Sequence, residues 1–210
     1  MITRLLIVLN VIGFLWEMYV GGSGVFGGNI PANSHVYDGM LAPVTITHDH
    51  QYYRIFTSAF LHGSIIHIGV NMFSLYMLGR FIELVLGSPR MLAIYIGSLI
   101  GAGVAIVYFS PPDAATLGAS GAIFGLFGAL FAIGLKLGER GFDLVRSNIG
   151  ILILNLIYSF SFPGISWQAH VGGLITGFLL TLVLFWPPKP VRTRAYDPNT
   201  GAVYESQLES

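Results

Sequence analysis

Six long apolar stretches dominate this sequence of 210 residues and decide what it can fold into. A helix that crosses a bilayer needs about 20 mostly apolar residues, with a range of about 17 to 25. We therefore expect membrane-spanning helices near residues 5–20, 58–81, 91–109, 114–135, 149–162 and 168–186. The sequence predicts an all-α fold, a polytopic membrane protein built as a bundle of these six transmembrane helices.

The composition excludes several other classes of protein. Charged residues make up 10% of the chain, against about 25% in ordinary soluble domains. So few charges cannot cover the surface of a soluble fold or form a basic face for nucleic acid. Cysteine is absent, which excludes disulfides, a thiol nucleophile and a zinc-thiolate site. The expected surroundings are the lipid bilayer, with no nucleic-acid partner.

The two ends of the chain need separate treatment. The first apolar stretch follows Arg4 and could be a signal peptide, but no A-x-A-like cleavage site follows it, which favours a retained helix. Prolines end the last helix, so we assign residues 1–187 to the membrane domain and residues 188–210 to a polar, loosely ordered cytoplasmic tail. The outer loop, residues 21–57, is too apolar for a linker and could lie on the membrane surface.

The basic residues indicate the orientation. If the N-terminus is cytoplasmic, nine of the ten Lys and Arg residues lie in inside segments, and only Arg54 lies outside. This is the bias that the positive-inside rule expects. A wrong number of helices would scramble it, so it supports six helices with both termini in the cytoplasm. The lack of a transit peptide points to a bacterial plasma membrane.

Three predicted helices contain two glycines four residues apart, a spacing that lets helix backbones approach closely. The pairs are Gly97 with Gly101, Gly121 with Gly125, and Gly173 with Gly177. We expect the last two pairs to dock against each other. No internal repeat is visible, so a transporter built from inverted repeats gains no support.

Polar side chains inside a membrane cost free energy, so each one is a candidate for function. His62, His67 and Asn71 lie in the first part of the second predicted helix. Ser120 is about 10 Å along its predicted helix at 1.5 Å per residue, and His170 lies near the start of the last. These helices all enter from outside, so the polar groups would share a cavity that opens outward. A channel or transporter would instead place polar groups through the full depth.

Ser120 and His170 have the chemistry of a nucleophile and its base. Small residues flank Ser120 and leave room for an acyl group, although the sequence is not a G-x-S-x-G elbow. A neutral imidazole beside the hydroxyl can take its proton. His67 and Asn71 share one helix face and could hold an oxyanion. Each residue alone also fits a structural role, in packing or in hydrogen bonds between helices.

The sequence predicts no metal site and no cofactor. His62 and His67 are five residues apart, a poor spacing for a metal on a helix, and no H-E-x-x-H motif occurs. The segment 48–50, His-Asp-His, is more simply a solvated loop. These observations argue against an intramembrane zinc protease.

Four further polar residues fit structural roles. We interpret Asn10 and Glu17 as interfacial or helix-pairing groups. Arg80 and Glu83 are three residues apart at a helix end, which predicts a surface ion pair. None of the acids Glu17, Glu83 and Asp113 is well placed to orient His170, so we expect packing to hold its ring.

Three segments together resemble the rhomboid family of intramembrane serine proteases. Residues 61–72 resemble its H-x4-H-x3-N signature, residues 118–121 its G-x-S-G motif, and residues 170–177 its H-x2-G-x3-G pattern. They occur in the family's order, and the resemblance covers roughly residues 1–187. It implies a rhomboid-like bundle and an endopeptidase that cleaves single-span transmembrane proteins with a Ser-His dyad. The alternative is a rhomboid-like protein that binds transmembrane segments without cleaving them.

The resemblance also implies a role for each site residue. Ser120 would be the nucleophile and His170 the general base. His67 and Asn71, with the Ser120 backbone N–H, would form the oxyanion hole, and His62 would shape the site.

Three positions depart from the family pattern in this implied assignment. Glu83 matches the acidic residue after the second helix, but Val85 stands where many members have Arg. Tyr53-Arg54 would stand at the Trp-Arg position of a half-embedded first loop, with Tyr in place of Trp. Phe124 stands where a Tyr commonly stacks beneath the histidine, so it keeps the ring and loses the hydroxyl. None of these three departures touches a reacting group.

Overall fold

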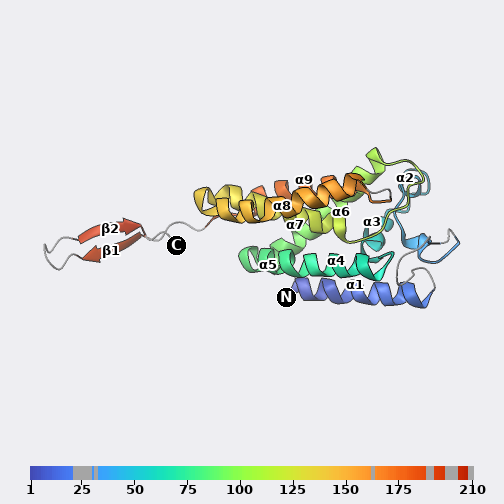
Figure 1. Cartoon of the computed structure of the whole chain (residues 1–210), viewed down its shortest axis with the longest axis horizontal. Helices are drawn as coiled ribbons and strands as arrows, with labels where there is room; N and C mark the ends of the chain where they lie inside the picture. The colour runs from blue at the N-terminus through green and yellow to red at the C-terminus, as the bar shows by residue number, and fades with distance from the viewer. Residues whose placement is uncertain (21–29, 31–32, 162–163, 188–191, 197–202, 208–210) are drawn as a thin grey trace.

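The computed structural model describes residues 1–20, 30, 33–161, 164–187, 192–196 and 203–207. Within these residues, six helices are long and apolar enough to cross a membrane, and they pack side by side (Figure 1). The prediction of an all-α, six-helix membrane bundle is confirmed. Part of the outer loop, at residues 21–29 and 31–32, lies outside the described residues.

The element bounds follow the chain. The spanning helices are α1 (Ile2–Tyr19), a continuous helix made of α4 (Ile65–Ser74), the π-helical turn η3 (Leu75–Gly79) and α5 (Arg80–Leu86), then α6 (Ser88–Phe109), α7 (Ser120–Leu137), α8 (Glu139–Ser161) and α9 (Trp167–Leu184). The first loop holds η1 (Tyr37–Gly39), α2 (Pro43–Thr47), α3 (Arg54–Thr57) and η2 (Ser58–Phe60).

Three predicted helix starts were wrong, each for a local reason. The second spanning helix begins at residue 65, not 58, because the Ser64 side chain caps it by accepting from the His67 N–H at 3.1 Å. α7 begins at residue 120, not 114, after Gly118 with its φ of +121°. α8 begins ten residues earlier than predicted, because its charged first turns lower the hydropathy without preventing a helix.

The tail is not loosely ordered in its described parts. β1 (Arg192–Tyr196) and β2 (Val203–Gln207) pair antiparallel, with Arg192 opposite Gln207. The sequence between them, Asp-Pro-Asn-Thr-Gly-Ala, is rich in residue types that favour turns. The polar composition of the tail did not predict this strand pairing.

The first loop is tied to the segment that precedes α7. Leu41 and Thr116 exchange backbone hydrogen bonds of 3.0 and 2.7 Å. The Val44 N–H adds a bond of 2.9 Å to the Pro112 carbonyl oxygen. These bonds hold residues 112–116 in a non-helical path, with a turn at 112–113, which keeps α7 from starting earlier.

Arg54 holds the first loop from inside. Its side chain is buried, and Nη1 donates to the carbonyl oxygens of Tyr37 and Met40 at 2.8 and 3.0 Å. Tyr53, at the aromatic position of the predicted anchor, is exposed. The guanidinium therefore fixes the loop, and the neighbouring ring contributes little burial.

Glu83 joins α5 to the start of α1. Its carboxylate accepts from the Ile2 N–H at 2.6 Å, from the Thr3 N–H at 3.0 Å and from the Thr3 hydroxyl at 2.7 Å. Arg80 bonds instead to the Tyr76 hydroxyl. The predicted Arg80–Glu83 surface pair was wrong, because the free N–H groups of a helix N-terminus are the better partners for a buried carboxylate.

α7 lies at the centre of the bundle and packs against α9 through glycine (Figure 1). A β-carbon at Gly173 would overlap the carbonyl oxygen of Gly121, and one at Gly177 would overlap that of Gly125. The two backbones therefore touch directly. The predicted docking of these two glycine faces is confirmed.

Replacing Gly177 by Ala should destabilise the bundle, because the new methyl group meets a backbone carbonyl that cannot turn away. Overpacking of this kind costs about 1–3 kcal/mol, which corresponds to about 2–4 °C in Tm per kcal/mol for a chain of this size. Gly150→Ala is the matched control, since nothing lies within 4 Å of a β-carbon there. Thermal unfolding in detergent compares the two, and equal Tm values would contradict direct backbone contact.

Candidate active site

Ser120 and His170 lie across the contact between α7 and α9. Ser120 Oγ is 2.8 Å from His170 Nε2. Ser120 is the first residue of α7, and His170 lies in the first turn of α9, so both face the same end of the bundle. Gly121 and Gly173 bring the two backbones together beside the pair. The structure thus joins two residues that are 50 positions apart.

Ser120 lies at the start of α7. The first N–H groups of a helix have no partner within it and carry a partial positive charge. The sequence placed Ser120 inside a helix that starts at residue 114, so its estimated depth of about 10 Å at 1.5 Å per residue does not apply. What distinguishes Ser120 is its place at the start of a helix, beside N–H groups without partners in that helix, and not its depth along the helix.

α4 brings His67 to the same place. A β-carbon at Gly118 would lie 2.8 Å from His67 Nε2 and 3.8 Å from Ser120 Oγ. Only glycine leaves room for this ring and also adopts the positive φ at residue 118. His67 Nε2 therefore lies close to the backbone at Gly118, in the neighbourhood of Ser120 Oγ.

Asn71 lies one helical turn beyond His67 on the same face, as predicted. Its side chain is buried, and Nδ2 donates to the His67 carbonyl oxygen at 3.0 Å. An amide carries two N–H donors, and this bond uses one of them. The orientation of the side chain is thus fixed by its own helix.

His62 lies in the segment before α4, not on the helix where the sequence placed it. Its ring is buried and meets the His67 ring edge to face, with centroids 5.0 Å apart. Its backbone N–H donates to Glu17 Oε1 at 2.6 Å. Glu17 of α1 therefore fixes the chain that leads into α4, a role the sequence did not reveal.

Two side chains hold the His170 ring. Phe124 stacks against it with centroids 4.1 Å apart and planes 8° from parallel, as the resemblance implied. Ser159 of α8 was not predicted, and its Oγ lies 2.6 Å from His170 Nδ1. Packing alone was expected to orient the ring, but a hydrogen bond contributes as well. No motif marks Ser159, because its role depends on how α8 meets α9.

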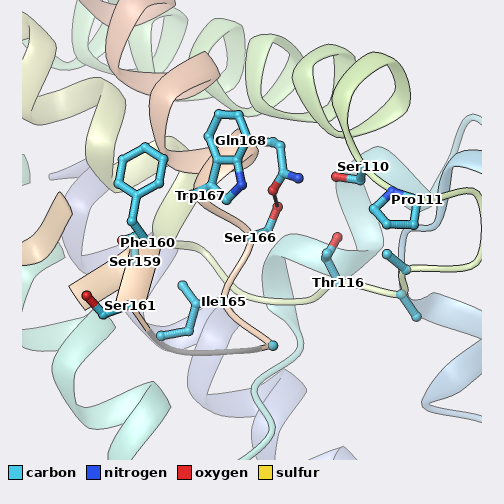
Figure 2. A pocket seen from close by; sticks show the side chains of 13 residues that line it. Ser110, Pro111, Thr116, Ser159, Phe160, Ser161, Ile165, Ser166, Trp167 and Gln168 are labelled. Carbon is cyan, nitrogen blue, oxygen red and sulfur yellow. Dashed lines mark hydrogen bonds between the residues drawn. The ribbon is translucent and has the colours of Figure 1, made fainter. Parts of the chain in front are cut away.

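A cavity of about 360 Å³ lies beside Ser159, the hydrogen-bond partner of His170 (Figure 2). Its walls come from the α6–α7 connection, the end of α8 and the start of α9. Hydroxyl groups of Ser110, Thr116 and Ser166 line it, together with Gln168. Ser159 belongs to the same lining, so the cavity reaches the partner of His170.

No group of three or more His, Cys, Asp or Glu side chains that could hold a metal occurs among the described residues. His48 and Asp49 pair with each other at 3.1 Å and are 84% and 44% exposed. This is the solvated loop that the sequence indicated for residues 48–50.

Five apolar helices pack around a sixth, α7, and together they define a multi-pass integral membrane protein. The chain belongs to the rhomboid family, because residues 49–187 match the Rhomboid domain. The three motifs all lie within this matched region.

Several known proteins are similar to this chain. Rhomboid protease GluP of Bacillus subtilis is 37% identical over 138 residues, which make up 65% of this chain and 27% of GluP. YdcA, a rhomboid relative from the same bacterium, is 34% identical over 63% of this chain and 67% of its own length. RHOMBOID-like protein 5 of Arabidopsis thaliana is 33% identical over 65% of this chain and 45% of that protein. The matched region is therefore less than half of GluP and of the plant protein.

Proposed function

We propose that this chain is an intramembrane serine endopeptidase, with Ser120 as the nucleophile and His170 as the general base. The observation that carries the proposal is the separation of 2.8 Å between Ser120 Oγ and His170 Nε2. At this distance an imidazole can take the hydroxyl proton as the oxygen attacks. Membership of a family that includes a protein named as a protease, GluP, supports the same reaction.

The proposed hydrolysis has two halves. Ser120 Oγ attacks the scissile carbonyl carbon while its proton passes to His170 Nε2. The imidazolium then gives this proton to the leaving amine, the peptide C–N bond breaks, and an ester remains on Oγ. A water molecule that loses its proton to His170 hydrolyses the ester and restores both side chains.

The oxyanion formed in each half needs donors, and we propose three candidates for this role. The Ser120 N–H is at the start of α7, where the helix dipole favours negative charge. His67 Nε2 lies in the neighbourhood of Ser120 Oγ, and Asn71 retains one amide N–H. Preorganised donors of this kind stabilise the transition state more than the bound substrate.

The dyad can be tested with a serine-directed probe and a labelled transmembrane substrate. We expect wild-type protein to be labelled at Ser120 and to cleave, and Ser120→Ala to do neither. His170→Ala should lose labelling, because the hydroxyl keeps its proton. Undiminished cleavage by Ser120→Ala would refute the nucleophile. Wild-type protein that binds the segment without cleaving it would favour the alternative, a silent rhomboid-like binding protein.

Loss of an oxyanion donor should affect the chemical step. His67→Ala and Asn71→Ala should each lower kcat by about 10²–10³-fold, with little change in KM. Asn148→Ala is the matched control, because that amide also donates to the carbonyl four residues back but belongs to α8. A rise in KM alone in both variants would mean that these residues bind substrate instead.

The proposed substrates are single-span membrane proteins, whose helices must open locally before Ser120 can attack. Gly and Pro lower the cost of opening a helix by about 1 and 3 kcal/mol relative to Ala. The glycines beside Ser120 favour a small residue at the scissile bond. Replacing a substrate's helix breakers by Leu should therefore slow cleavage, and equal or faster cleavage in a detergent assay would count against helix opening.

The proposed location is a bacterial plasma membrane with both termini in the cytoplasm. The chain has no cysteine of its own, so single cysteines report the side on which they lie. Both Asp113 and Glu139 are exposed. Asp113→Cys should react with an impermeant thiol reagent from outside, and Glu139→Cys only from inside. The reverse pattern would overturn this orientation.

A further inference from the structure

Ser159 occupies the position that an acidic residue fills in a catalytic triad. It lies near the end of α8 with 2% of its surface exposed. Its Oγ is 2.6 Å from His170 Nδ1, on the side of the ring opposite Nε2, and 2.6 Å from the Asn155 carbonyl oxygen. One hydroxyl therefore bridges the backbone of α8 and the imidazole.

The donors and acceptors of this bridge determine the tautomer of His170. A hydroxyl has one proton to donate and lone pairs that accept. The Asn155 carbonyl can only accept, so the Ser159 proton lies toward it. His170 Nδ1 must then donate to Ser159 Oγ, which leaves Nε2 without a proton. This is the tautomer in which Nε2 accepts a hydrogen bond from Ser120.

We infer that Ser159 is a positioning residue that holds His170 as the Nδ1–H tautomer, with Nε2 free to act as the base. The inference rests on the proposed Ser120–His170 chemistry. Phe124 fixes the plane of the ring, but stacking does not distinguish its two nitrogens. The hydrogen bond to Ser159 makes that distinction, because it fits only one tautomer.

Kinetics of full-length protein in detergent test the inference. Ser159→Ala should lower kcat by about 10–100-fold, the loss expected for a hydrogen bond to a group that becomes charged, and leave KM and Tm nearly unchanged. Ser159→Thr should restore most of kcat, since Thr can also bond the carbonyl four residues back and residue 159 lines the cavity (Figure 2). Ser161→Ala, an exposed serine of the same helix and cavity, should match wild type.

A second measurement does not depend on a variant at residue 159. The ¹⁵N spectrum of histidine-labelled wild-type protein, with the His170 signals identified by their loss in His170→Asn, should show Nδ1 protonated and Nε2 unprotonated. An Nε2–H tautomer, or a Ser159→Ala variant with wild-type kcat, would overturn the inference while Ser120→Ala remained inactive. Full activity of Ser120→Ala would instead remove the proposed function itself.

Discussion

The direct contact between the backbones of α7 and α9 is the constraint on which the rest of the structure depends. Gly121 and Gly125 meet Gly173 and Gly177 with no side chain between them. Inside a bilayer the hydrophobic effect does not drive helices together, so close packing of this kind must hold them. The contact also fixes the distance between Ser120 and His170, because each lies within three residues of a contacting glycine. The packing of α7 against α9 and the proposed Ser120–His170 chemistry therefore depend on the same helix contact.

The position of Ser120 depends on a second constraint, outside the helices. The Leu41–Thr116 pairing and the bond from the Gly118 N–H to the Ser58 carbonyl oxygen hold the preceding segment in a non-helical path. α7 can begin only where that path ends. The first N–H groups of α7 then lie beside Ser120, the proposed nucleophile, rather than being used up by an earlier turn. The first loop thus contributes to the site without supplying a reacting group.

Patterns that depend on periodicity and composition predicted the six helices and the facing glycine pairs. Helix starts were harder, because a single cap such as Ser64, or one positive φ at Gly118, outweighs the hydropathy of the surrounding residues. Partners that no motif or spacing marks could not be predicted. Glu83 is explained only once α1 lies beside α5, and Ser159 only once α8 lies beside α9. The motifs identified the residues around Ser120 but not what orients them.

The buried carboxylates of Glu83 and Glu17 accept from backbone N–H groups, whereas His170 bonds to two serine hydroxyls. Glu83 is held by N–H groups at the start of α1, and Glu17 accepts from a backbone N–H. A carboxylate at Nδ1 of His170 would need comparable donors to offset its desolvation within the membrane. A serine hydroxyl needs an acceptor for one proton, which the Asn155 carbonyl provides. In the proposed mechanism, a neutral Ser159 would stabilise the His170 imidazolium less than a carboxylate does. It would, however, leave no buried charge beside His170 in the steps in which the imidazole is neutral.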